Sequence, residues 1–323
     1  MPDAAKKERS AQKKRADQMR QTQTNHTQAC PEILYEDNHL LVAVKLPGVL
    51  SQADGSQAPD MLTLLKHYLK VKYQKPGQVF LGLVHRLDRP VGGVMVFART
   101  SKAAARLSEQ IRRHELEKIY LAVVDGCPEP SQGQWQDYLE KDHRLNKVTR
   151  SDAVKGKAAW LFYKTLQTDP ATGMSLIAVK LGTGRGHQIR VQLALHGCPI
   201  AGDRKYHPAY QVQHQLKNTS LKEDVRQTQD SGKFEVNAVP DETNQQNQPR
   251  FYSETKNQTK NGSDVQLKAD SDQIKTAALW AGNLGFRHPV TREWLRFTAP
   301  VPAEAPWPLF MPVSEDLLHD WPP

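Results

Sequence analysis

The sequence predicts an α+β fold with a mixed, largely antiparallel sheet and flanking helices. Segments with strand-like texture outnumber helical ones, and the two kinds do not alternate strictly as they would in a doubly wound parallel fold. The first two apolar runs are also separated by a short polar turn, which is typical of antiparallel pairing. A chain of 323 residues can hold one large domain or two ordinary ones, and either buries a substantial core.

The N-terminal part of the folded region predicts a hairpin followed by a helix. Apolar runs at 33–35 and 40–44 flank the polar turn at 36–39, which is the pattern of two antiparallel strands. Leucines at helical spacing then predict a helix over 60–73, and Asp60 stands where an N-cap is needed.

The remaining elements follow from shorter signals. A helix is expected over 101–115, opened by Ser101, and a second over 187–197, where Gly197 suits a left-handed C-terminal cap. The segment from 279 onward, "LWAGNLGFRHPV", restores strand-like texture after a long polar stretch. Further strands are expected at 80–85, 93–99, 118–126, 133–139, 158–165, 174–182 and 293–298.

Two segments have a composition that argues against a packed core. Residues 1–30 predict a disordered basic arm, which acts either as a solvated tail or as a non-specific contact to phosphates. The stretch at about 208–275 is rich in Asn, Gln, Lys, Thr and Asp with isolated apolar residues, so we expect a disordered insertion. The folded domain is therefore expected over 31–323 with this interruption.

Charge and cysteine content narrow the class of protein. Lys+Arg number 44 against 35 Asp+Glu, giving a net charge of +9 and a pI near 9.3, which favours an anionic partner such as nucleic acid. Three scattered cysteines (Cys30, Cys127 and Cys198) predict a reducing compartment without a disulfide framework. No run of about 18 apolar residues and no secretory signal occur, so we expect the cytoplasm and no membrane.

Three clusters could carry chemistry, and each also has an ordinary explanation. The run His85-Arg86-Leu87-Asp88 ends a strand, where Asp88 could also be a surface ion pair. Lys118 and Tyr120 begin a strand, where a tyrosine is often half-buried packing. Arg185 lies among three glycines before a helix, in a turn that could bind a phosphate or leave the arginine solvated.

Several kinds of catalysis are poorly supported. The histidines form no H-x-x-x-H pair, no cysteine–histidine set has zinc spacing, and no G-x-S-x-G occurs, so no metal, cofactor or serine nucleophile is predicted. A hydrolase using Asp88 with Glu117 or Asp203 is a third alternative, but Asp203 in "AGDRKY" is better interpreted as a structural turn residue. A carboxylate, a tyrosine and arginines on a basic scaffold suit cofactor-free chemistry on nucleic acid.

Four segments, taken in order, resemble a known family. They are "HRLDRPVGGVMVFART", "EKIYLAVVDG", "GRGHQIRVQLALHGCPIAGDRKY" and "LGFRHPVTREWLRFTAP", and "YEDNHLLVAVKLPGVLSQ" before them resembles the strand–turn–strand that opens the same domain. Together they are similar to the RluA family of RNA pseudouridine synthases. The resemblance implies an α+β catalytic domain with a cleft across the sheet, which isomerises uridine in ribosomal or transfer RNA without metal or organic cofactor.

The resemblance also implies roles for individual residues. Asp88 corresponds to the aspartate that attacks a flipped-out uridine, and Tyr120 to the tyrosine that stacks on the base and helps remove the C5 proton. Arg185 corresponds to the arginine that pairs with the aspartate. A guanidinium partner favours the charged form of a carboxylate, and an aromatic face compensates for part of the cost of unstacking a base.

RNA contacts are expected from Arg86, His187 and Arg190, with Arg86 at the position that fills the gap left by the flipped base. The alternative function is a non-catalytic RNA-binding module on the same scaffold. No obligate protein partner is indicated, and a monomer is expected.

Besides the insertion at about 208–275, the chain departs from the family pattern in two places. Where the family commonly has Thr-Ser-Gly after the aspartate motif, this chain has Val91-Gly92-Gly93, and the lost hydroxyl predicts a looser turn. No S4-type RNA-binding domain is expected before the catalytic domain, so selection of RNA would rest on the catalytic domain and the basic arm.

Overall fold

The computed structural model describes residues 30–211 and 276–311. The basic arm expected over 1–30 lies outside these ranges except for Cys30, and so does the expected insertion from 212 to 275. Residues 208–211, which we had placed in the insertion, are helical and belong to the folded part. The chain divides into two compact units, Met1–Arg113 with Arg287–Phe297 (unit 1) and His114–Phe286 with Thr298–Pro323 (unit 2). That residues 31–323 form one catalytic domain stays a prediction.

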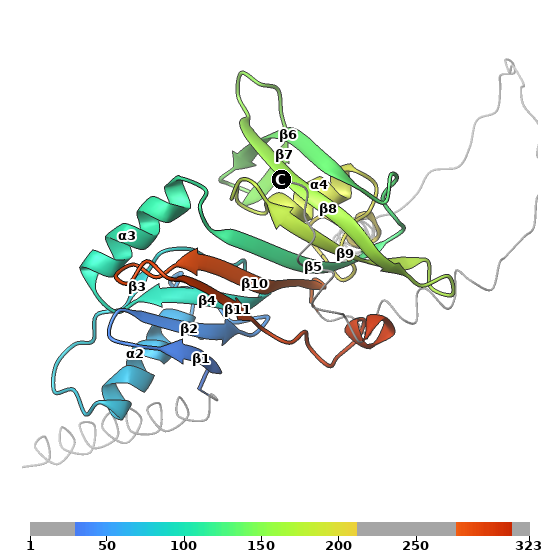
Figure 1. The fold of residues 1–323 in the computed structure, drawn as a ribbon. Helices are drawn as coiled ribbons and strands as arrows, with labels where there is room; N and C mark the ends of the chain where they lie inside the picture. The colour runs from blue at the N-terminus through green and yellow to red at the C-terminus, as the bar shows by residue number, and fades with distance from the viewer. Residues whose placement is uncertain (1–29, 212–275, 312–323) are drawn as a thin grey trace, which may run out of the picture. The chain divides into compact units, whose positions relative to one another are not determined.

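Unit 1 contains a small antiparallel sheet with two helices (Figure 1). The hairpin of β1 and β2 has the predicted position, and β2 continues the ladder by pairing in antiparallel register with β4 along its whole length. The short strand β3 also pairs antiparallel with β4. The bounds are β1 (Ile33–Glu36), β2 (Leu40–Lys45), α2 (Met61–Lys72), β3 (Gly82–Leu83), β4 (Gly92–Ala98), α3 (Ser101–Arg112) and β11 (Trp294–Thr298), of which the last residue of β11 falls in unit 2.

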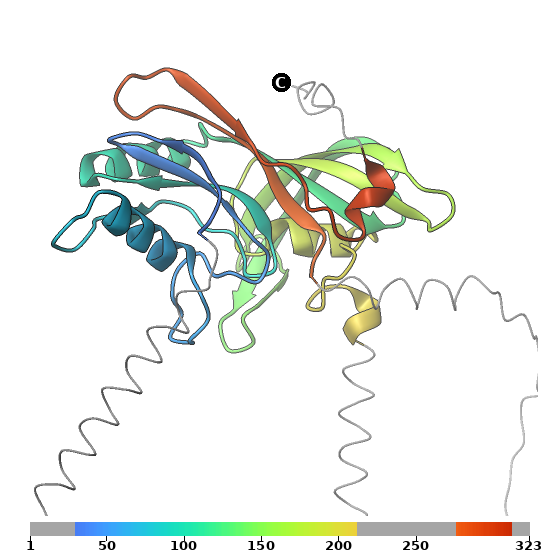
Figure 2. The ribbon, with the colours of Figure 1, turned by 90° about the horizontal axis from the view of Figure 1, so that it is seen from below.

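Side chains cap both helices of unit 1 at their N-termini. The Asp60 carboxylate accepts the amide proton of Thr63 at 3.0 Å, as the sequence predicted for α2. For α3 the cap is Thr100 rather than Ser101, because the Thr100 hydroxyl accepts from the amide of Ala103. α2 lies against one face of the strands of unit 1 (Figure 2) and buries Met61, Leu65 and Leu69.

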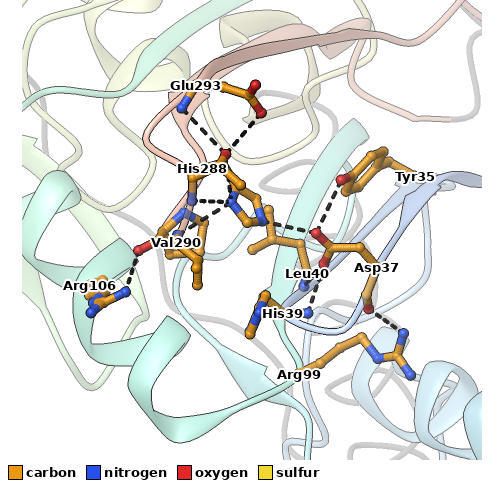
Figure 3. A network of polar contacts seen from close by, with 11 residues as sticks. Tyr35, Asp37, His39, Leu40, Arg99, Arg106, His288, Val290 and Glu293 are labelled. Atoms are coloured by element: carbon orange, nitrogen blue, oxygen red, sulfur yellow. Dashed lines mark hydrogen bonds and ion pairs between the residues drawn. The ribbon is translucent and has the colours of Figure 1, made fainter.

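A polar network in unit 1 joins two turns that are far apart in the sequence (Figure 3). The Asp37 carboxylate accepts from the amides of His39 and Leu40 at 2.7 and 2.6 Å, which fixes the turn between β1 and β2. It also lies 2.9 Å from Nε2 of His288, whose Nδ1 accepts the amide of Thr291. These bonds lower the pKa of Asp37 against the opposing effect of its burial, which raises it.

Unit 2 contains a larger antiparallel sheet (Figure 1). Its strands follow the order β10-β5-β9-β8-β6-β7, and every pairing along this order is antiparallel. The bounds are β5 (Glu117–Asp125), β6 (Gln132–Asp142), β7 (Lys147–Arg150), β8 (Lys157–Thr168), β9 (Met174–Leu181), α4 (Gln188–Leu195), β10 (Leu279–Arg287), whose last residue falls in unit 1, and the 3₁₀ helix η2 (Trp307–Phe310).

Helix α4 covers the β6–β8 part of unit 2. Its Val191 packs in a buried cluster with one residue from each of these three strands, Leu139, Val148 and Ala159. The helix ends as predicted: Gly197 has φ of 78°, its amide donates to Ala194, and the amide of Cys198 donates to the carbonyl of Leu193. These two bonds satisfy carbonyls at the end of the helix.

The structure confirms the α+β class with a mixed, mostly antiparallel sheet. The strand expected over 80–85 is wrong in extent, because only Gly82 and Leu83 enter the ladder. Strand β7 was missed. All three cysteines are free, with Cys30 and Cys127 exposed and Cys198 buried. Within the described residues, no helix has the length and apolar character needed to span a membrane.

Candidate active site

Asp88 lies in the segment of unit 1 that connects β3 to β4. The amide of Val91 donates to the Asp88 carbonyl at 3.0 Å, which closes a turn directly after the carboxylate. Gly92 and Gly93 begin β4, and Gly93 has φ of 122°, where a side chain is strained. That the turn is looser because of Gly92 stays a prediction. Arg86 is exposed and Asp88 is half-buried.

Side chains rather than a strand ladder hold the residues before Asp88. The Ser51 hydroxyl donates to the Leu87 carbonyl at 2.8 Å and accepts the Leu87 amide at 3.1 Å, so both main-chain groups of Leu87 are paired. Nε2 of His85 accepts the amide of Val96 in β4 at 3.0 Å. These contacts position the residues on either side of Arg86 while that arginine stays in solvent.

A buried lysine holds the residues after Asp88. Lys45 has no exposed surface, and its Nζ donates to the carbonyls of Leu46 at 3.2 Å, Arg89 at 3.2 Å and Val91 at 2.6 Å. Burial lowers the pKa of Lys45 to about 7, the negative charge of Asp88 acts in the opposite direction, and Arg89 lowers it further. Sequence reasoning missed Lys45, although a lysine ending the apolar run "LLVAVK" was the available signal.

Tyr120 and Lys118 lie on β5 in unit 2. Tyr120 is 9% exposed and pairs with Val179 of β9. On the other side of β5, the register with β10 shifts between Trp280 and Asn283, so the ladder is irregular opposite Tyr120. Such irregularities are frequent beside active sites because they redirect side chains. Burial lowers the pKa of Lys118.

Hydrogen bonds from the Gln188 side chain hold the loop that carries Arg185. Sequence reasoning missed Gln188 as well. The Gln188 side-chain oxygen accepts from the amide of Arg185 at 3.0 Å and from the hydroxyl of Thr183 at 2.8 Å. Its amide nitrogen donates to the carbonyl of Trp160 at 3.0 Å. Gly182 is required here, because a Cβ at this position would overlap the Trp160 ring.

Arg185 itself is exposed, and its Nε donates to the carbonyl of Ala158 at 2.9 Å. His187 follows at the helix N-terminus with φ of 53°, and its Nδ1 lies 2.6 Å from the hydroxyl of Tyr206. His187 as a whole is half-buried.

Arg190 forms a buried ion pair. Its Nε and Nη2 donate to the two carboxylate oxygens of Asp203 at 2.7 and 2.8 Å, and both residues are buried. This bidentate pair gives Arg190 a structural role and does not support the RNA contact expected of it, which stays a prediction. Asp203 also accepts the amides of Lys205 and Tyr206, as expected for a structural turn residue.

The structure therefore groups the predicted residues by unit. Arg86 and Asp88 share one segment of unit 1. The Nζ of Lys45 donates to carbonyls directly after Asp88. Arg185, His187 and Arg190 share one loop and helix of unit 2, and Tyr120 lies on β5 of the same unit. Among the described residues, no group of three His, Cys, Asp or Glu side chains is arranged to hold a metal ion.

Two solved structures of human proteins have a similar fold. The structure is similar to human RNA pseudouridylate synthase domain containing 4, with a TM-score of 0.58 and 21% identity over 84% of this chain and 89% of that one. Human RNA pseudouridylate synthase domain containing 1 gives a TM-score of 0.53 with 18% identity and covers 84% of each chain. The fold is thus that of pseudouridylate synthase domains.

Sequence comparison finds similar proteins over about half of the chain. The family described as RNA pseudouridylate synthase matches residues 39–195. An uncharacterized RNA pseudouridine synthase of Bacillus subtilis, YhcT, is 32% identical over 54% of this chain and 57% of its own length. Ribosomal large subunit pseudouridine synthase D of Zymomonas mobilis is 34% identical over 59% of this chain and 61% of its own length. Over residues 39–195 the chain is therefore similar to RNA pseudouridine synthases, and it spans about three-fifths of the length of these relatives.

Proposed function

We propose that the chain is an isomerase that converts uridine to pseudouridine in RNA. The observation that carries this proposal is the Asp88 segment. It lies within the family match at 39–195, and its flanking main chain is fixed by Lys45, Ser51 and His85. A carboxylate that must attack a nucleotide gains from such positioning, because a pre-formed geometry removes part of the entropic cost of reaction.

Asp88 is the proposed nucleophile. In the reaction the bond from ribose C1′ to uracil N1 breaks, C1′ bonds to C5, and the C5 proton leaves while N1 gains one. Substrate and product are isomers, so neither an oxidant nor an organic cofactor is needed. The base must first leave the RNA stack, at a cost of a few kcal/mol.

Tyr120 and Arg185 are the other proposed catalytic residues, with Tyr120 stacking on the base and assisting proton removal at C5. Stacking on an aromatic ring contributes about 1–3 kcal/mol per base. Arg86 and His187 are the proposed RNA contacts. The exposed side chain of Arg86 supports its role as the group that replaces the flipped base in the stack.

The proposed substrate is ribosomal RNA. Relatives from several bacteria carry the name ribosomal large subunit pseudouridine synthase C or D, and the net charge of +9 suits a polyanionic partner. Transfer RNA is the second candidate, because the residues that support the chemistry do not select between folded RNAs. We further propose a cytoplasmic enzyme that acts as a monomer.

The test compares the native protein with Asp88→Asn on total RNA transcribed from unmodified templates. Chemical mapping should find new pseudouridine with the native protein, and its rate should fall at least about 10⁴-fold in the variant, because an amide cannot act as the nucleophile. RNA affinity should stay within severalfold. If both proteins bind RNA equally and neither converts uridine in any RNA class, the chain is a binding module instead.

A further inference from the structure

Unit 2 contains a basic cavity that is lined by Arg185 and by lysines to which the proposed chemistry gives no role. Its volume is about 440 Å³, and it lies between the strands β6 and β7, the start of β8, and the loop that carries Arg185. All of its lining residues belong to unit 2. The lining residues are Leu139, Glu140, Lys141, His143, Val148, Lys155, Lys157, Gly184, Arg185 and Gly186.

The lining carries a strong excess of positive charge. Lys141, Lys155, Lys157 and Arg185 are all exposed, and Glu140 is the one carboxylate among the lining residues. The Glu140 carboxylate accepts the hydroxyl of Ser151 at 3.0 Å. Within residues 30–211 and 276–311, no acid forms an ion pair with any of these four cations.

The acids that are nearest in sequence are used elsewhere. Oδ1 of Asp142 accepts the amides of Arg144 and Leu145, and Oδ1 of Asp152 accepts the amides of Val154 and Lys155. Each carboxylate therefore serves a turn of the backbone. Four cations share one lining carboxylate, so their mutual repulsion is only partly offset, and an anion that enters relieves it.

We propose that this cavity binds phosphates of the substrate RNA strand and so holds the strand next to Arg185. The inference rests on the proposed function, and it assigns Lys141, Lys155 and Lys157 as positioning residues that hold the strand rather than as catalytic residues. The lysines come from two separate strand-end segments, 139–148 and 155–157. Because the cations are spread over two segments, they suit the successive phosphates of one RNA strand better than a single small anion.

Flexible lysines suit this task. An ammonium group makes a salt-dependent contact without requiring a fixed orientation of the phosphate, whereas a planar guanidinium imposes one. Arg185 is the one lining cation whose side chain is anchored, by the bond from its Nε to Ala158. The cavity therefore combines one oriented cation with three adaptable ones, which fits a polymer that must slide into place.

The test uses the full chain with Lys141, Lys155 and Lys157 all changed to Gln, while Arg185 stays. Binding of a short single-stranded RNA is measured by fluorescence anisotropy at a series of salt concentrations. Losing three phosphate contacts should lower the slope of log K against log salt by about 2 and weaken binding roughly tenfold at low salt. The three side chains are exposed, so the Tm should stay unchanged.

A matched variant removes the same charge from unit 1. Lys70, Lys75 and Lys102 are exposed, lie on or next to α2 and α3, and do not line the cavity. If the cavity variant and this control change the salt slope equally, the proposal is overturned. It is also overturned if pyrophosphate loses affinity for the cavity variant while RNA does not, since the cavity then serves a small anion.

This binding measurement does not depend on turnover. A native protein that forms no pseudouridine contradicts the proposed function, but a larger salt-slope loss in the cavity variant than in the control would still identify the cavity as the RNA contact. In the converse case the native protein modifies RNA, and the cavity variant keeps its slope and its KM. That result would support the proposed function and would contradict the proposed RNA-binding role of the cavity.

Discussion

The two units hold their candidate residues by different means. In unit 1, the buried side chains of Lys45 and Ser51 bind main-chain groups on both sides of Asp88, so uncharged carbonyls and amides do most of the positioning. In unit 2, the helix that follows the Arg185 loop is fixed by a buried ion pair between Arg190 and Asp203. The two units should therefore respond differently to substitution. Removing one charge of a buried ion pair lowers the free energy of unfolding more than removing one hydrogen bond does.

The largest effect is expected for Arg190→Met. The Asp203 carboxylate would stay buried without its counter-charge, so the free energy of unfolding should fall by about 3–5 kcal/mol. Urea denaturation measures this loss, and the double variant Arg190→Met/Asp203→Asn should recover much of it, because the uncharged amide oxygen can still accept from the amides of Lys205 and Tyr206. A loss of RNA affinity with native stability would instead support the RNA contact that the sequence suggested for Arg190.

Ser51→Ala should have a smaller effect on unit 1. The variant leaves the amide and carbonyl of the buried Leu87 without their partner, which should cost about 1–3 kcal/mol of stability. Activity should fall further than stability explains, because the segment before Asp88 loses an anchor. Ser56→Ala is the matched control: its hydroxyl bonds the exposed Asp54, so stability should change by less than about 0.5 kcal/mol. Equal effects of the two variants would contradict the role given to Ser51.

The third prediction concerns pH and Lys45. Its folded pKa of about 7 lies below the ordinary lysine value, so between pH 7 and 10 the unfolded chain binds the proton that the folded chain has lost. Raising the pH therefore favours the folded state through this group, by at most about 1.4 kcal/mol per pH unit. The difference in unfolding free energy between the native protein and Lys45→Met should rise over this range. A flat difference would show that Lys45 keeps its proton.

The sequence predicted the elements whose signals are local. The hairpin needs only two apolar runs and a turn, and the helix over 187–197 ends at a glycine whose positive φ no larger residue adopts easily. The strand over 80–85 was overextended because its apolar texture suggested a ladder. Leu87 is instead held by the distant Ser51 hydroxyl and His85 by a bond from its own ring to the backbone of β4, and no local pattern records either contact.

The sequence could predict those site residues that lie within a recognisable motif. The family blocks identified Asp88, Tyr120 and Arg185 as candidates, but the environment of each charge depends on partners elsewhere in the chain. Arg190 is separated from Asp203 by 13 residues, so the sequence could not show whether its guanidinium meets a carboxylate or solvent. Lys45 was hidden for the same reason, because its acceptors near residue 90 are brought to it by the pairing of β2 with β4.

The contact between His85 and β4 limits the proton chemistry around Asp88. Nε2 of His85 accepts the amide proton of Val96, so this nitrogen is not available to take a proton from a nucleotide while β4 is intact. The imidazole three residues before Asp88 would be the obvious candidate for a general base, yet its Nε2 instead joins the loop to the β4 backbone. In the proposed reaction this nitrogen would not take the C5 proton, which would leave through the tyrosine, another group or water.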